Sequence, residues 1–343
     1  MINRNNPLAG YDVHADVNMA SFDGRDVYDR HGTAINDPTL TGRDVLRAAD
    51  LHDLQVEKRQ AVCMANDGET LVDMPDRHAT WSRRTDRYMG NVGKLYQCWQ
   101  YEDVLDVLDS LVGEGRLRYS VVGSMGNGAR AFVTAKILGD DGRITMNDAD
   151  VTNKYLTAIS GHDGGVSLSF MAHTSRPWCG NVFPMILREA ATAGTILRFR
   201  HTGDLAKKQA IAVQAFTKAQ ADLKKYELDL AAMHAVKITA AQAEQFVQVL
   251  VPDVEQGKNN TRRLKKRAQI LYLHNHHASN THPAVRGTVA AAFQAAVQWA
   301  DWVGVRGKGT EQQFRSAMFG TGAAFKHTAR KTALQFANTY AVN

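Results

Sequence analysis

The chain reads YLTAISGHDGGVSLSFMAHTSRPWCGNVFPMILREAATAGTILRFRHTGD from Tyr155 to Asp204. Runs rich in β-branched and aromatic residues, near 155–159 and 166–174, are typical of strands. Between them, Gly161–Gly165 reads GHDGG, which is typical of a turn because glycine accepts a positive φ and aspartate can cap the loop. The segment therefore predicts two antiparallel strands joined by a polar turn.

The sequence before this segment is also rich in strands. Asn66-Asp67-Gly68 and Asn127-Gly128 are strong hairpin turns, because these residues adopt the positive φ that a tight turn needs. Apolar periodicity predicts a helix over 102–112. We also expect a short helix opened by Thr41 as its N-cap. The expected strands are 56–64, 70–74, 80–87, 116–122 and 129–138.

Alternation in the second hairpin places its cations on one face. Leu117, Tyr119 and Val121 share a face at a period of two, and Arg116 and Arg118 share the other. The partner strand repeats the pattern. We therefore expect one apolar face on a core and one face carrying four cations. These are Arg116, Arg118, Arg130 and Lys136.

The sequence becomes mostly helical after Cys179. Heptad spacing runs along a long helix over 204–233, which could pack on its own domain or on another subunit. The chain thus predicts an α+β fold: an antiparallel β-hairpin sheet packed with helices, followed by a mostly helical C-terminal half. We expect an irregular N-terminal arm (1–40), an α+β core (41–235) and a helical C-terminal region (236–343). Helices are expected at 180–193, 239–250, 260–278, 284–302 and 310–340, and a last strand at 195–200.

Composition narrows the class of protein. The 343 residues carry a net charge of +6, which modestly favours polyanionic partners. Three cysteines without a Cys-x-x-Cys pair argue against a disulfide framework or a cysteine-rich zinc site. No segment has the length of a membrane helix or the pattern of a signal peptide. We expect a cytoplasmic protein that needs no cofactor.

Polar side chains in the quoted segment could suggest an active site. His162, Asp163, Cys179 and His201 lack the spacing of a metal or nucleophile motif, so we interpret them as architectural and expect neither catalytic nor metal-binding residues. His274, His277 and His282 fit a solvated helix end. The chain is therefore not expected to be an enzyme.

The clustered cations are better candidates for function. Arg83, Arg84, Arg87 and Lys94 alternate with Trp81, Tyr88 and Tyr96, and such mixtures bind phosphates and stack on bases. A solvated face would give the same pattern. The candidate nucleic-acid-binding residues are Arg83, Arg84, Arg87, Lys94, Arg116, Arg118, Arg130, Lys136, Arg176, Arg198 and Arg200.

Several motifs in order resemble a known family. They are Arg84–Arg87, Gly90–Gln97, Gly128–Val133, His162–Gly165, Arg176-x-x-Cys179-x-Asn181 and Phe319–Gly322. Together they resemble the phage/plasmid-like protein family that carries domain of unknown function 932. One departure lies at Gly287–Ala290, where the family has an aromatic-rich block.

The resemblance implies a function in phage recombination, because the family's β-core is similar to phage single-strand annealing proteins. We expect an ATP-independent protein that binds and anneals single-stranded DNA in a bacterial host cell, as a homo-oligomeric ring or filament. The alternative is a phage regulatory or host-interaction protein, such as an anti-defence or replication accessory factor, without annealing activity.

Overall fold

The computed structural model describes residues 33–34, 39–146, 150–176, 181–184, 197–254, 260–305, 310–318 and 320–341. Antiparallel sheets dominate its N-terminal half and helices its C-terminal half, so the expected α+β fold is confirmed. The expected arm at 1–40 lies outside the described residues apart from 33–34 and 39–40. No described helix has the length and apolar character needed to cross a membrane.

The main sheet has the strand order β1-β5-β6-β8-β9-β10, with β7 pairing with β8 and β11 with β9. All its pairings are antiparallel. The β5–β6 hairpin confirms the Asn127-Gly128 turn, where φ is 55° and 87°. The strands are β1 (Thr33–Ala34), β5 (Leu117–Met125), β6 (Arg130–Ile137), β7 (Arg143–Met146), β8 (Asp150–Gly161), β9 (Leu168–Arg176), β10 (Asn181–Pro184) and β11 (Leu197–Phe199).

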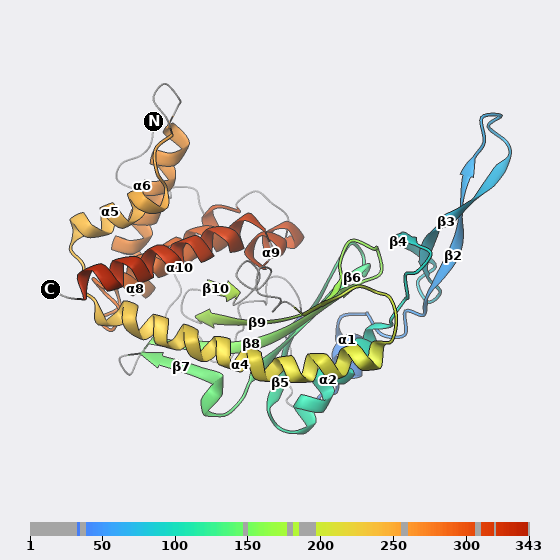
Figure 1. The fold of residues 1–343 in the computed structure, drawn as a ribbon, viewed down its shortest axis with the longest axis horizontal. Coiled ribbons are helices and arrows are strands. Elements are labelled where there is room, and N and C mark those ends of the chain that lie inside the picture. The colour runs from blue at the N-terminus through green and yellow to red at the C-terminus, as the bar shows by residue number, and fades with distance from the viewer. Residues whose placement is uncertain are drawn as a thin grey trace.

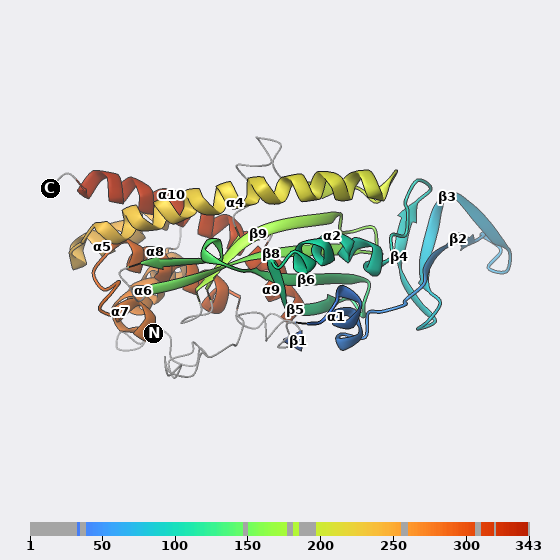
Figure 2. The same cartoon turned by 90° about the horizontal axis from the view of Figure 1, so that it is seen from below.

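A second, three-stranded sheet stands out from the body at one end of the molecule (Figures 1 and 2). Its strands are β2 (Val56–Met64), β3 (Leu71–Ser82) and β4 (Arg87–Gly93). The expectation of separate strands at 70–74 and 80–87 is wrong: β3 continues through Pro75, which lies at a β-bulge opposite Gln60–Val62, where a missing N–H is tolerated.

Helices cover one face of the main sheet. They are α1 (Gly42–Ala48), α2 (Tyr101–Gly113) and α4 (Leu205–Ala235), and α4 runs along the sheet in both views (Figures 1 and 2). Thr41 caps α1 in a capping box with Asp44, as expected. Alternate strand residues such as Leu117, Val133 and Ala158 pack against these helices in one buried core.

The opposite face of the sheet is covered in part by α9 (Thr310–Met318). Met318 packs there against Val121, Phe132, Ile159 and Met171. Among the described residues, the sheet therefore has a helical layer on one face and α9 against part of the other.

The C-terminal half packs around the apolar helix α8. Its elements are α5 (Ala240–Leu250), α6 (Thr261–His276), α7 (Ala278–Thr281), α8 (Val289–Gln298), the π-helical turn η4 (Trp299–Val303), α9 and α10 (Thr321–Tyr340). The single helix expected over 310–340 divides at Gly320. In place of the helix start expected at Gly180, residues 181–184 form β10, which pairs with β9.

The heptad residues of α4 pack within their own chain. Phe216 and Leu223 are buried against the sheet, whereas Tyr226, Leu230 and Met233 are buried in the helical core. Of the two interpretations of the seam, the structure supports packing within the protein.

Candidate nucleic-acid interface

Strand alternation gathers arginine and lysine on the second face of the main sheet. Arg118 lies opposite Lys136 across the β5–β6 ladder, and Arg130 lies six residues before Lys136 on β6, on the same face. On β9 and β11, Arg198 lies opposite Ser169, which shares this face with Met171. We call the following set the basic face: Arg118, Arg130, Lys136, Arg143, Arg198 and Arg315.

One end of the basic face forms an open pocket of about 430 Å³. Arg118, Lys136 and Arg143 line it, together with Asp140 of the 3-10 turn η3 (Asp140–Gly142). The three cations and one carboxylate named here give this pocket, at the β6–β7 connection, an excess of positive charge. Such a surface attracts the phosphates of a nucleic-acid backbone.

The other end of the basic face forms a second pocket, of about 190 Å³. Arg130, Arg198 and Arg315 line it from β6, β11 and α9. Apolar walls come from Met125 and Ile159. Elements far apart in the sequence thus bring three guanidinium groups to one hollow.

The middle of this face is buried and polar. The hydroxyl groups of Thr134 and Thr157 lie 2.8 Å apart, and Thr157 Oγ1 lies 2.9 Å from His173 Nε2. His173 stacks on Tyr155 with ring centroids 5.2 Å apart. Burial lowers the pKa of His173 to about 3, so this ring is neutral.

Arg116 and Arg176 were both predicted as contact residues, but they lie away from the basic face. Arg116 precedes β5 and its guanidinium lies 4.6 Å from the Phe216 ring centroid of α4, on the helical side. A bulge after Tyr119 also reverses the alternation, so that Val121 faces α9 instead of sharing the face of Leu117. The expected set of four cations on one face is therefore corrected to three.

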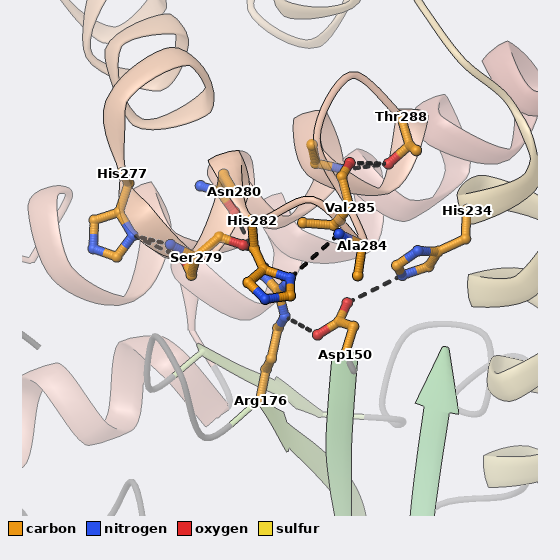
Figure 3. Close-up of polar contacts among 11 residues, drawn as sticks. Asp150, Arg176, His234, His277, Ser279, Asn280, His282, Ala284, Val285 and Thr288 are labelled. Atoms are coloured by element: carbon orange, nitrogen blue, oxygen red, sulfur yellow. Dashed lines mark hydrogen bonds and ion pairs between the residues drawn. The ribbon is translucent and has the colours of Figure 1, made fainter. Parts of the chain in front are cut away.

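Arg176 is buried, with 1% of its surface exposed. Its Nε donates to Asp150 Oδ1 at 2.6 Å and its Nη2 donates to the Ser279 carbonyl at 3.0 Å. Figure 3 shows Asp150 between Arg176 and His234, whose Nε2 lies 3.1 Å from Asp150 Oδ2. Burial raises the pKa of Asp150, but Arg176 and His234 outweigh it and hold the pKa below its ordinary value. This cluster joins the sheet to α4 and α7, so Arg176 is left out of the proposed interface.

His277 belongs to the same region. The sequence pattern predicts a solvated helix end here, but the His277 side chain is buried. Its ring N-caps α7 by accepting from the Ser279 backbone N–H at 3.3 Å (Figure 3). The His274–His282 segment thus closes a helix joint.

The predicted cations of the second sheet are only partly available. Arg84 donates to Asp50 Oδ1 at 2.7 Å, and Arg83 lies 3.8 Å from Glu57. Arg87 and Lys94 are exposed. Two of the expected stacking rings are already occupied: Arg59 lies over Trp81 at 4.7 Å and Tyr96 stacks on His201 at 4.8 Å. Tyr88 is 53% exposed.

His162 and His201 lie inside the fold. His201 is sandwiched between Tyr96 and Trp99, with both ring centroids 4.8 Å away. His162 packs on Tyr101 at 4.4 Å, and neither of its ring nitrogens has a hydrogen-bond partner among the described residues. Cys179 lies outside the described residues. Across the ranges that the structure describes, no three metal-ligand side chains form a group that could hold an ion.

Sequence reasoning missed Arg143 and Arg315. Arg143 lies at the start of the short strand β7, which was not expected, and its register opposite Asn153 places it on the basic face. Arg315 comes from a helix more than a hundred residues after β11. No sequence spacing signals that contact, because it depends on how the helical half packs on the sheet.

The family defined as a domain of unknown function (DUF932) matches residues 88–332. No curated protein and no solved structure matches the chain. The matched range includes every residue of the basic face.

Proposed function

Because the chain belongs to the family of the domain of unknown function DUF932, a name that carries no activity, we propose its function from its own surface. The protein binds single-stranded nucleic acid along the basic face and promotes strand annealing without ATP. Its binding depends on phosphates rather than on base sequence.

The observation that carries the proposal is the convergence of six cations on one side of the sheet. They lie in two pockets, with the carboxylates of Asp140 and Asp163 beside them. A nucleic-acid strand that contacts both pockets would run along β6, from Arg130 at its start to Lys136 near its end. The described aromatic rings on this face are buried, so backbone contacts supply most of the affinity.

Annealing is the finer part of the proposal. It is supported by the resemblance of the sequence motifs to a family whose β-core is similar to phage single-strand annealing proteins. A protein that holds phosphates while leaving bases exposed allows a second strand to pair with the first, and this step requires no nucleotide hydrolysis.

Fluorescence anisotropy with labelled single- and double-stranded oligonucleotides tests binding. Each phosphate contacted should contribute about −0.7 to the slope of log K against log salt on single strands. The triple variant Arg118→Glu/Lys136→Glu/Arg143→Glu should bind at least about tenfold more weakly. A fluorescence-quenching assay with complementary strands should show the same loss of annealing rate.

The matched control makes three charge reversals away from the sheet. Lys225, Arg262 and Lys331 are exposed on α4, α6 and α10. This control has the same net charge as the test variant. Equal weakening in both variants would show that only the total charge matters and would overturn the interface.

A second candidate function is binding of a protein partner, and the exposed end of the β2–β3 ribbon favours it. Met64 and Leu71 are each 64% exposed and pair across the ribbon. An isolated two-stranded ribbon is marginally stable in water, so a partner would stabilise it. If the wild type fails to bind oligonucleotides, this second function becomes the better one.

A further inference from the structure

The pocket of about 190 Å³ at one end of the basic face has features beyond general positive charge. Its three arginines come from three elements, and Ser167 and Ser169 add hydroxyl groups to the lining. A flat basic surface holds a mobile strand, whereas a hollow with convergent donors can enclose a single group.

The β8–β9 loop holds one of these arginines in place. Arg130 Nε donates to Asp163 Oδ2 at 2.6 Å, and Asp163 Oδ1 accepts from the Gly165 N–H at 2.9 Å. A side chain at Gly165 would place its Cβ 2.8 Å from Arg130 Nη2, so the guanidinium would have to shift to make room for it.

The same loop is fixed from behind by β4. A Cβ at Gly90 would lie 2.4 Å from the Asp163 Cα, so the strand and the loop are in direct contact. Gly164 has a φ of 73°, and a Cβ there would lie 2.9 Å from the Asn91 carbonyl. The His-Asp-Gly-Gly sequence thus positions Asp163, and Asp163 positions Arg130.

The other two arginines are not neutralised by the described part of the chain. Arg198 and Arg315 are exposed, and no carboxylate of the described residues forms an ion pair with either. Three guanidinium charges and the Asp163 carboxylate leave a net charge of two positive in the pocket.

We propose that this pocket binds a phosphate monoester, the terminal phosphate of a nucleic-acid strand. A monoester carries a charge of about −1.5 to −2 near neutral pH, whereas an internal phosphodiester carries about −1, so the monoester matches the pocket charge. One guanidinium group can donate two parallel hydrogen bonds to two oxygens of a phosphate. That the phosphate belongs to a nucleic-acid strand rests on the proposed function, whereas binding of a phosphate group by the pocket does not.

Anisotropy with one oligonucleotide sequence in three forms tests the terminal group: a 5′-phosphate, a 3′-phosphate, or hydroxyl groups at both ends. We expect one phosphorylated form to bind the wild type about tenfold more tightly than the hydroxyl form. The variant Arg198→Gln/Arg315→Gln should lose this preference and bind all three forms with equal affinity, while its overall binding weakens because both residues belong to the basic face. Equal binding of all three forms by the wild type, or an unchanged preference in the variant, would overturn the proposal.

Isothermal titration with inorganic phosphate separates the pocket from the strand. If the wild type binds no oligonucleotide, the proposed function fails, and the pocket is then judged by this titration alone. Binding that is lost in Arg198→Gln/Arg315→Gln supports a phosphate site for a small molecule instead of a strand end. Absence of inorganic phosphate binding together with absence of oligonucleotide binding overturns the site.

Asp163→Asn tests the positioning role of the loop. Removing a negative charge should strengthen binding of phosphate if only the total charge matters. If Asp163 positions Arg130, the variant should instead bind the phosphorylated oligonucleotide several-fold more weakly, with its melting temperature measured to confirm that it is folded. Tighter binding by this variant would overturn the positioning role.

Discussion

Lowering the pH from 7 to 5 should strongly destabilise the protein because of three buried histidines. Burial lowers the pKa of His162 and His173 to about 3 and that of His201 to about 4. In the unfolded chain the same rings have a pKa of about 6.5. The folded state therefore keeps them neutral at pH 5, whereas the unfolded state binds protons.

The sign and magnitude follow from proton linkage. The pKa values are lowered on folding, so the stabilisation is complete above pH 6.5 and is lost as the pH falls towards 4. Between pH 7 and 5, each ring costs about 2 kcal/mol of unfolding free energy, or roughly 6 kcal/mol for three. A typical domain has roughly 5–15 kcal/mol in total, so the effect is large.

Urea unfolding at pH 7, 6 and 5, followed by tryptophan fluorescence, measures this loss. His162→Phe should reduce the loss by about 2 kcal/mol, since neither ring nitrogen of His162 has a hydrogen-bond partner in the described part of the chain and an aromatic ring can still pack on Tyr101. The matched control is His276→Phe at an exposed position, which should leave the pH dependence in place. The same unfolding free energy at pH 7 and 5 would refute the reasoning.

Three further predictions concern the fold and assembly. Gly164→Ala should lose about 3 kcal/mol and Gly68→Ala about 1 kcal/mol in urea unfolding, because both have a positive φ but only Gly164 would contact backbone; equal losses would contradict this. Arg176→Met should lose about 3–5 kcal/mol, because it leaves Asp150 buried beside His234 alone; a loss under about 1 kcal/mol would show that the pair is hydrated. Light scattering at micromolar concentration should give a mass well above 37.8 kDa, and Met64→Asp/Leu71→Asp should reduce it; a wild-type monomer would exclude assembly through the ribbon.

Local signals predicted much of the sheet. Asn127-Gly128 identified the β5–β6 hairpin because the turn demands positive φ at both residues, which few other residues supply. The GHDGG sequence identified the β8–β9 connection for the same reason, although only Gly164 uses positive φ there. A Cβ at Gly165 would displace the nearby guanidinium of Arg130, a contact that no local pattern contains.

The interface was predicted less completely because it depends on contacts between distant elements. The bulge after Tyr119 changes which residues face the helices, and a period of two cannot reveal an inserted residue. Arg176 carries the same charge as Arg198, yet it pairs with Asp150 in the interior. Burial separates these two arginines, and it is set by the packing of α7 rather than by their neighbours in sequence.

The helix α4 fixes the spacing of two hydrophobic cores. Phe216 and Leu223 belong to the core of the sheet, and Tyr226, Leu230 and Met233 belong to the helical core. One residue inserted between Leu223 and Tyr226 would rotate the second group by about 100° away from its partners. Seven inserted residues would nearly restore the angle but move that group by about 10 Å. The number of residues between the two groups on this helix is therefore fixed. In related chains that keep both cores, insertions and deletions should lie outside this part of α4.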